Sequence, residues 1–137
     1  MPADQNKEII RKIFEEGMNN HNLSVVEQYV APEYINHGIP GHNPGPEGFK
    51  EIILGFTNAF PDMIITQDEI IADGNTVATR GSWTGTNKGS FMGMPATGKQ
   101  VKVSYIDFWK IKDGKCVENW VQMDIAGLMQ QLGAIPS

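Results

Sequence analysis

The amino-acid sequence predicts an α+β fold: a cone-shaped, curved antiparallel sheet packed by N-terminal helices, followed by one short C-terminal helix. Before residue 61, apolar residues recur at helical spacing, whereas between residues 63 and 123 they alternate in runs rich in β-branched residues. The pair Asp113-Gly114 between two such runs is a strong hairpin signal. A curved sheet with helices on one face leaves an apolar space between the layers, which is a common place for a ligand.

The first helix is indicated by an apolar face that follows Asp4. Gly17 weakens this helix, and the polar segment "NNHN" ends it. The face consists of Ile9, Ile10, Ile13, Phe14 and Met18.

A second, short helix is predicted by the segment "SVVE", which has the form of a capping box with Ser24 as N-cap and Glu27 reaching back. It ends near Val30, because Pro32 discourages its continuation. The segment "YINHGIPGHNPGPEGF" is dense in Gly, Pro and Asn and reads as an ordered loop. Pro46 suits the first turn of a third, amphipathic helix that Pro61 stops.

Four strands are predicted next, with the sequences "MIITQDEIIA", "TVATRGSWTGT", "VKVSYIDFWKI" and "KCVENWVQM". A long Gly-rich loop separates the second from the third. The final helix is "IAGLMQQL", and Gly133 is a suitable residue just after its end.

The length of 137 residues suits one domain, residues 1–137, with a core of its own. The net charge of −5 and the scattered Lys and Arg residues argue against binding to nucleic acid or to an anionic membrane. Cys116 is the single cysteine, so neither an internal disulfide nor a Cys-rich metal site is expected. No secretory signal and no apolar run of about 20 residues is visible, which predicts a soluble, cytoplasmic protein.

Asp107 stands out in the third predicted strand, because every other residue of its parity is apolar. That parity therefore faces a core or a pocket. A buried carboxylate needs a hydrogen-bond donor, an Arg partner or a function. A purely structural Asp107, held by a backbone or indole N–H, remains an open alternative.

Asp124 directly precedes the last helix, where Asp is a favoured N-cap. Capping alone would account for it. A second role is compatible, since a pocket wall raises a carboxyl pKa while a helix N-terminus lowers it. An ionised carboxylate kept in a dry site is what a general base requires.

Other polar residues are weaker candidates. His37 and His42 flank the Gly/Pro loop, but without a cluster of carboxylates they do not predict a metal site. His21 is expected in solvent. Arg80 pairs with Asp107 or Asp124 or points to solvent, and these alternatives stay open. The three tryptophans are expected in the core or a pocket wall: Trp83, Trp109 and Trp120.

Five segments carry a resemblance to a known family: "YINHG", "AFPDM", "GSFMGMPATGKQV", "IDFWKIKDGKCVENW" and "VQMDIAGLMQQLGAI". Over residues 7–135 the chain resembles the SnoaL-like polyketide cyclases, or predicted ester cyclases, of the nuclear-transport-factor and ketosteroid-isomerase-like superfamily. The last two segments, in that order, are the most specific. The chain departs from the family pattern at three positions: Asn36 before His37, Ala96 in "PATG", and Asn119 where a histidine is common.

The resemblance implies a cone-shaped α+β barrel that assembles as a homodimer or homotetramer. It also implies a cofactor-independent cyclase, without metal, that closes a ring of a polyketide methyl ester by intramolecular aldol condensation. The partner is then a small hydrophobic, aromatic or polyketide-like molecule. By the same resemblance, Asp124 is the acid/base and Asp107 lies in the pocket around it. We further hypothesise that Asp107, held protonated by its apolar face, is a second catalytic group that donates to the substrate oxygen. The predicted substrate-binding residues are His37, Arg80, Tyr105, Trp109, Trp120 and Gln122.

Two alternatives accompany this hypothesis. A non-catalytic small-molecule-binding module or oligomeric scaffold on the same fold predicts affinity without turnover. Epoxide hydrolysis in this superfamily uses an Arg two residues before an Asp on one strand. Tyr105 has that position before Asp107, so Arg80 would have to substitute from another strand.

Overall fold

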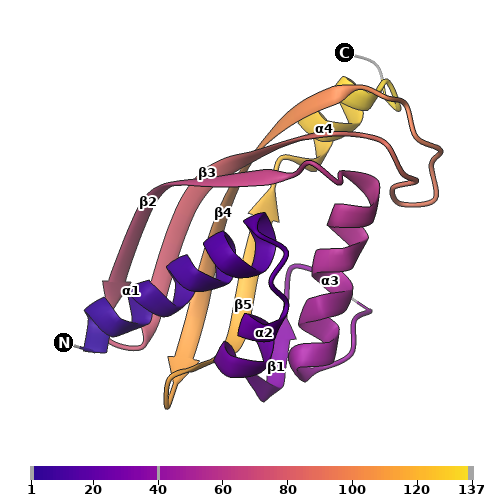
Figure 1. Ribbon diagram of the computed structural model, residues 1–137. Helices are drawn as coiled ribbons and strands as arrows, with labels where there is room; N and C mark the ends of the chain where they lie inside the picture. The colour runs from indigo at the N-terminus through magenta and orange to yellow at the C-terminus, as the bar shows by residue number, and fades with distance from the viewer. Residues whose placement is uncertain (1, 40, 136–137) are drawn as a thin grey trace.

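The structure, a computed structural model, describes residues 2–39 and 41–135. Within these residues, five strands form one sheet in the order β1-β5-β4-β3-β2. Figure 1 shows α1 and α3 lying on the same face of this curved sheet, with α4 at one end. The predicted α+β fold, with N-terminal helices on one face and a short C-terminal helix, is confirmed. The sheet is open, because β1 and β2 at its two edges do not pair with each other.

The N-terminal helix changes its geometry halfway along. α1 (Pro2–Lys12) continues directly into a π-helical segment, η1 (Ile13–Asn19). The wider turn leaves Phe14 buried against the sheet. Asn19 fixes the end of η1, because its side chain donates to the Ile65 carbonyl at 2.9 Å and accepts from the Ile65 N–H at 2.8 Å. The sequence predicted the end of this helix but not its π-helical turn.

The segment after the second helix differs from the prediction. The capping box is not formed: α2 (Ser24–Tyr29) includes Ser24 as its first residue, and the Asn22 side chain accepts from both the N–H and the hydroxyl of Ser24. The predicted loop begins instead in β1 (Val30–Asn36), which pairs in parallel with β5. The sheet is therefore mixed rather than antiparallel. Pro32 is tolerated because β1 is an edge strand.

The remaining elements match the predicted order. α3 (Gly45–Ala59) has Pro46 in its first turn and ends before Pro61. The strands that follow are β2 (Ile64–Asp73), β3 (Thr76–Thr86), β4 (Gln100–Lys112) and β5 (Lys115–Met123). The turn between β4 and β5 has positive φ at Asp113 and Gly114, as its sequence predicted. α4 (Ile125–Leu132) ends at Gly133, whose φ is 80°. Over the described residues, every helix is too short or too polar to cross a membrane.

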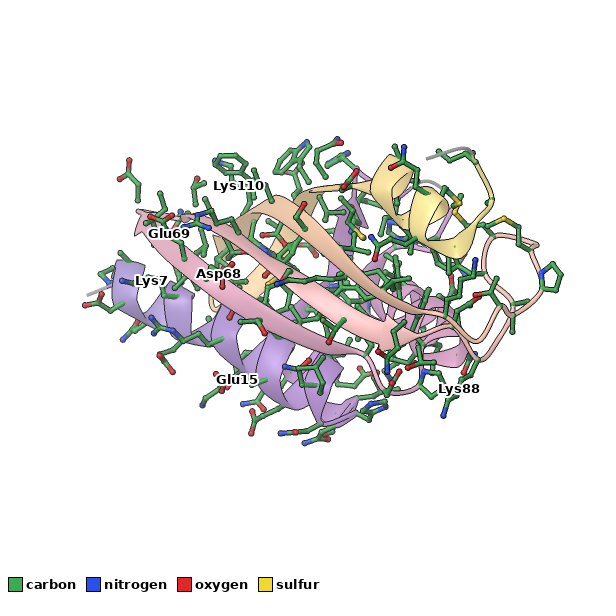
Figure 2. The ribbon with its side chains drawn as sticks, turned by 90° about the horizontal axis from the view of Figure 1, so that it is seen from above. Lys7, Glu15, Asp68, Glu69, Lys88 and Lys110 are labelled. Carbon is green, nitrogen blue, oxygen red and sulfur yellow. The ribbon has the colours of Figure 1, made fainter. Side chains whose placement is uncertain are left out.

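The two faces of the sheet have different environments. The inner face packs against α1, η1 and α3 in the main hydrophobic core, and a second apolar cluster lies beneath α4. None of the described helices crosses the middle of the outer face. In Figure 2, Lys110 lies on this outer side, while Glu15 lies on the side of the N-terminal helix. Large apolar side chains are exposed along one row of paired residues on this outer face: Ile71, Phe108 and Trp120.

The absence of a side chain at Gly81 lets β2 approach β3 closely, and a substitution at this position tests that packing. A Cβ at Gly81 would lie 1.9 Å from the Thr66 carbonyl oxygen, and this backbone atom cannot move aside. We expect Gly81→Ala to lower the free energy of unfolding by about 1–3 kcal/mol in urea titrations. The matched control is Gly55→Ala in α3, where a Cβ meets nothing within 4 Å. This change should stabilise the protein by about 0.5–1 kcal/mol. Equal effects of the two changes would contradict the tight packing.

Candidate functional site

An apolar cavity of about 80 Å³ lies between the inner face of the sheet, η1 and α3. The β-strands supply its polar groups, whereas the helices supply mainly apolar side chains. The aromatic rings in its wall come from elements far apart in the sequence: Phe14, Tyr34, Phe49, Phe56, Trp83, Tyr105 and Trp109. A cavity of this kind is the default place for a ligand in an α+β fold.

β4 brings Tyr105, Asp107 and Trp109 to the cavity. Buried and exposed residues alternate without interruption along this strand, as the sequence predicted. Asp107 is 3% exposed, and it is the only carboxyl group among the described residues that line the cavity. The same lining contains no Lys, Arg or His. The electrostatics of the cavity therefore depend on the protonation of Asp107.

Among the described residues, one side chain donates a hydrogen bond to Asp107. Thr79 lies opposite on β3, and its hydroxyl donates to Asp107 Oδ1 at 2.5 Å. Burial raises the pKa of Asp107 to about 7, and the donors Thr79 and Trp109 offset part of this increase. The Trp109 indole favours the carboxylate by proximity, although its N–H forms no hydrogen bond with any described residue. Asp107 can therefore both release and accept a proton near neutral pH.

Several donors in the cavity wall lack partners. The Tyr105 hydroxyl and the indole N–H groups of Trp83 and Trp109 are buried, and none has an acceptor among the described residues. Burial raises the pKa of Tyr105 to about 12, against a lowering by the nearby Thr79 hydroxyl. The phenol therefore keeps its proton and remains a donor at neutral pH.

A buried amide network forms another part of the wall. Asn36 of β1 donates through Nδ2 to Asn119 Oδ1 at 2.9 Å, and the Tyr34 hydroxyl reaches the same oxygen at 3.4 Å. Asn119 in turn donates to the Phe108 carbonyl at 2.9 Å. Burial raises the pKa of Tyr34 well above its usual value. These polar lining residues were not predicted as site residues, nor was Thr79. What identifies these residues is that their side chains point inward from the strands, and this orientation is known only once the β1–β5 pairing is known.

Asp124 lies outside this cavity. It is exposed, and its Oδ1 accepts the Gly127 N–H at 2.9 Å, so the N-cap interpretation is confirmed. Its surroundings are a shallow groove on the outer face of the sheet, which it shares with Arg80 and Gln122. The structure thus separates the two aspartates that the sequence grouped as a catalytic pair.

Gln122 and Trp120 also require a correction. The sequence placed them in one pocket wall with Asp124, but they have the outward parity of β5, whereas Asn119 and Val121 face the cavity. The physical reason is the register, which sets Trp120 opposite the outward residue Phe108.

Arg80 and His37 lie outside the cavity as well. Arg80 is exposed and donates through Nε to Glu69 at 2.7 Å, so it pairs with neither Asp107 nor Asp124. His37 Nε2 lies 2.9 Å from a Glu118 carboxylate oxygen, and its ring stacks on Trp120 with centroids 4.9 Å apart. Of the six predicted substrate-binding residues, the structure brings Tyr105 and Trp109 to the cavity. No group of three His, Cys, Asp or Glu in the described ranges is placed to hold a metal ion.

The fold and the cavity define a class: small α+β proteins that enclose an apolar site between a curved sheet and its covering helices. The sequence model of the SnoaL-like polyketide cyclase family matches residues 8–132. The chain therefore belongs to the SnoaL-like polyketide cyclase family, as the sequence motifs indicated.

Individual relatives agree with this assignment. The chain is 29% identical over 130 residues to the aklanonic acid methyl ester cyclase DnrD of Streptomyces peucetius, covering 92% of this chain and 89% of that protein. Among solved structures, TsrD from Streptomyces laurentii superposes with a TM-score of 0.90 at 26% identity, covering 98% of this chain and 99% of that one. IdmH from Streptomyces antibioticus has a TM-score of 0.79 at 30% identity, covering 94% and 99%.

The raised pKa of Asp107 predicts how stability depends on pH. Its pKa is 3.8 in an exposed carboxyl and about 7 in the folded protein. Below pH 4, Asp107 is protonated in both the folded and the unfolded protein. Between pH 4 and 7, Asp107 loses its proton only in the unfolded protein. The free energy of unfolding therefore falls through this range, by about 4 kcal/mol in total.

Asp107→Asn removes this titration. Urea unfolding of both proteins should show Asp107→Asn gaining about 2 kcal/mol or more relative to the wild type between pH 5 and pH 8. A difference between the two proteins that does not change with pH would contradict the raised pKa.

Proposed function

We propose that the protein is a cofactor-independent enzyme of the polyketide-cyclase type, which closes a ring of a small, hydrophobic, polyketide-like substrate by an intramolecular aldol reaction. Membership of the family and the likeness to aklanonic acid methyl ester cyclases support this proposal. The observation that carries it is Asp107, a lone carboxyl in an apolar cavity with a pKa of about 7. A general acid/base works best when its pKa lies near the working pH.

Asp107 would act twice in this reaction. Its carboxylate takes a proton from the carbon next to a substrate carbonyl, and the electron pair of the broken C–H bond forms an enolate. The enolate carbon attacks a second carbonyl of the same molecule, so that one C–C bond forms and the second oxygen becomes an alkoxide. Protonated Asp107 then returns the proton to this alkoxide. The cycle needs no oxidant, and the carboxylate is restored.

Position favours Asp107 over Asp124 for this role. A general base must come within about 2.6–3.2 Å of the proton that it removes, directly or through one water. Asp107 lines the cavity, whereas Asp124 caps α4 on the outer face. We therefore assign the proton transfer, which the sequence motif placed on Asp124, to Asp107.

The size of the cavity adds a condition to the proposal. Its volume of about 80 Å³ is below the roughly 150 Å³ of an apolar cavity that binds benzene in another protein. A ring-closing substrate is larger, so the cavity must widen or admit only the reactive end.

The central test is turnover by Asp107→Asn, with aklanonic acid methyl ester as the first substrate to try. Loss of the acid/base should lower kcat by about 10²–10⁴-fold. In the wild type, kcat/KM should increase with pH up to about 7 and then level off, because the free enzyme must hold an ionised Asp107.

Asp124→Asn is the matched control, since it keeps the size and capping ability of Asp124 outside the cavity. It should retain turnover within a few-fold. Turnover that survives Asp107→Asn but is lost in Asp124→Asn would return the role to Asp124. Binding of the substrate without turnover in the wild type would favour the non-catalytic binding module.

We also propose that the chain self-associates through the outer face of the sheet. Ile71, Phe108 and Trp120 form an exposed apolar row, with Ile106 beside it. Exposed apolar patches on small proteins commonly mark interaction surfaces. Charged groups of both signs, Arg80 with Glu69 and Lys110, lie around this row and allow a second copy to pair with it.

Light scattering coupled to size-exclusion chromatography tests this surface. The wild type should have at least twice the mass of one chain, and Phe108→Lys should shift it toward the monomer. The matched control is Leu54→Lys, because Leu54 is similarly exposed but lies on α3, on the other side of the sheet. A monomeric wild type would exclude the proposed association.

A further inference from the structure

Two donors on β4 flank Asp107 without an acceptor. Tyr105 and Trp109 lie two residues before and after it on the same face of the strand. They are 6% and 0% exposed, and neither the Tyr105 hydroxyl nor the Trp109 N–H has a partner among the described residues. Buried donors are nearly always paired, so these two groups, together with the unpaired Trp83 N–H in the same wall, indicate an acceptor that the ligand supplies.

Both donors lie close to Asp107, and their rings share one packing partner. Phe14 of η1 meets each ring edge-on, with centroid distances of 6.0 Å to Tyr105 and 5.8 Å to Trp109. The Thr79 hydroxyl, which donates to Asp107, also lies close enough to the Tyr105 phenol to lower its pKa. The Trp109 indole acts on Asp107 itself. The π-helical turn thus holds two rings whose polar ends lie beside the same carboxyl.

The charges around the cavity restrict the ligand. No Lys, Arg or His among the described residues lines it, so an anionic ligand finds no counter-charge there. Most of the wall is apolar, and its unpaired groups are donors. A neutral, mainly apolar molecule with an acceptor oxygen satisfies both conditions.

We propose that Tyr105 Oη and Trp109 Nε1 form a two-donor subsite for the carbonyl oxygen of a neutral, mainly apolar ligand, which sets the neighbouring carbon beside Asp107. The inference rests on the proposed function in taking this cavity as the substrate site. Preorganised donors of this kind stabilise the negative charge that develops on the oxygen when the neighbouring carbon loses a proton. The pair would thus determine both which end of the substrate enters and which carbon reacts.

A matched pair of small probes tests the subsite. Acetophenone and ethylbenzene have nearly the same size and differ in the carbonyl oxygen, and neither can undergo ring closure. Calorimetric titration should show that the wild type binds acetophenone about tenfold more tightly or better, since each hydrogen bond contributes roughly 2- to 10-fold. In Tyr105→Phe and Trp109→Phe this preference should fall several-fold. In the same two variants, the infrared C=O stretch of bound ¹³C-labelled acetophenone should move from its wild-type value toward its value in hydrocarbon solvent, because a hydrogen bond to the oxygen is lost.

Two controls separate the subsite from a structural role. Tyr29→Phe removes a phenol on α2 outside the cavity and should leave the preference unchanged. Tyr105→Phe should not lower the stability of the unliganded protein, because its buried hydroxyl has no hydrogen-bond partner among the described residues and its removal relieves a desolvation cost. If Trp109→Phe does not fold, the subsite is still tested by Tyr105→Phe, whose stability is measured in this way.

Four results would overturn the inference: failure of the wild type to bind either probe, equal affinity of the wild type for both probes, a preference unaffected by Tyr105→Phe, or tighter binding of benzoate than of acetophenone. These outcomes are independent of turnover. A carbonyl preference in a wild type that closes no ring would refute the proposed function and leave the subsite in place.

Discussion

The uninterrupted alternation of side chains along β4 is the constraint on which the rest of the structure depends. β4 is the central strand of the sheet, so each of its inward residues is covered by helices and each outward residue lies on the open face. A shift of one residue would exchange Asp107 for the exposed Phe108 or Ile106 and would destroy both the cavity and the core. Because β3 and β5 pair with β4 residue by residue, they have the same alternation. Thr79 lies opposite Asp107 on the inner face of the sheet, and Trp120 lies opposite Phe108 on the outer face.

A carboxyl at such a position has two opposing requirements. Desolvation favours the protonated form, whereas a base must be ionised to act. Thr79 and the nearby Trp109 indole partly compensate for the lost water, and the balance leaves the pKa of Asp107 near 7. Complete pairing would fix Asp107 in the charged form, and the absence of donors would fix it in the neutral form. The same apolar wall that makes the residue costly to bury thus makes it able to exchange protons.

Much of the architecture could be predicted from the sequence because its signals are local. Periodicity located α3 and four strands, Asp113-Gly114 located the hairpin, and Gly133 located the end of α4. β1 was missed because its hydrogen-bond partner β5 is some 85 residues away and its own sequence contains Pro32. The π-helical segment η1 was missed; Asn19 at its end bonds to Ile65, a contact between distant segments that local spacing does not reveal. Both missed elements lie beside the cavity.

By itself, the sequence determined the α+β class, the family, the inward parity of Asp107 and the capping of α4 by Asp124, since each depends on spacing along the chain. Only the tertiary structure decided which aspartate meets the cavity. Asp124 lies between the end of β5 and the start of α4, in the groove of the outer face with Gln122, and Trp120 shares the outward parity of Gln122. Side-chain parity has meaning only relative to a partner strand, and that partner becomes known when the sheet is assembled. For the same reason, the cluster of Thr79, Tyr105, Asp107 and Trp109 is a product of folding rather than of any one motif.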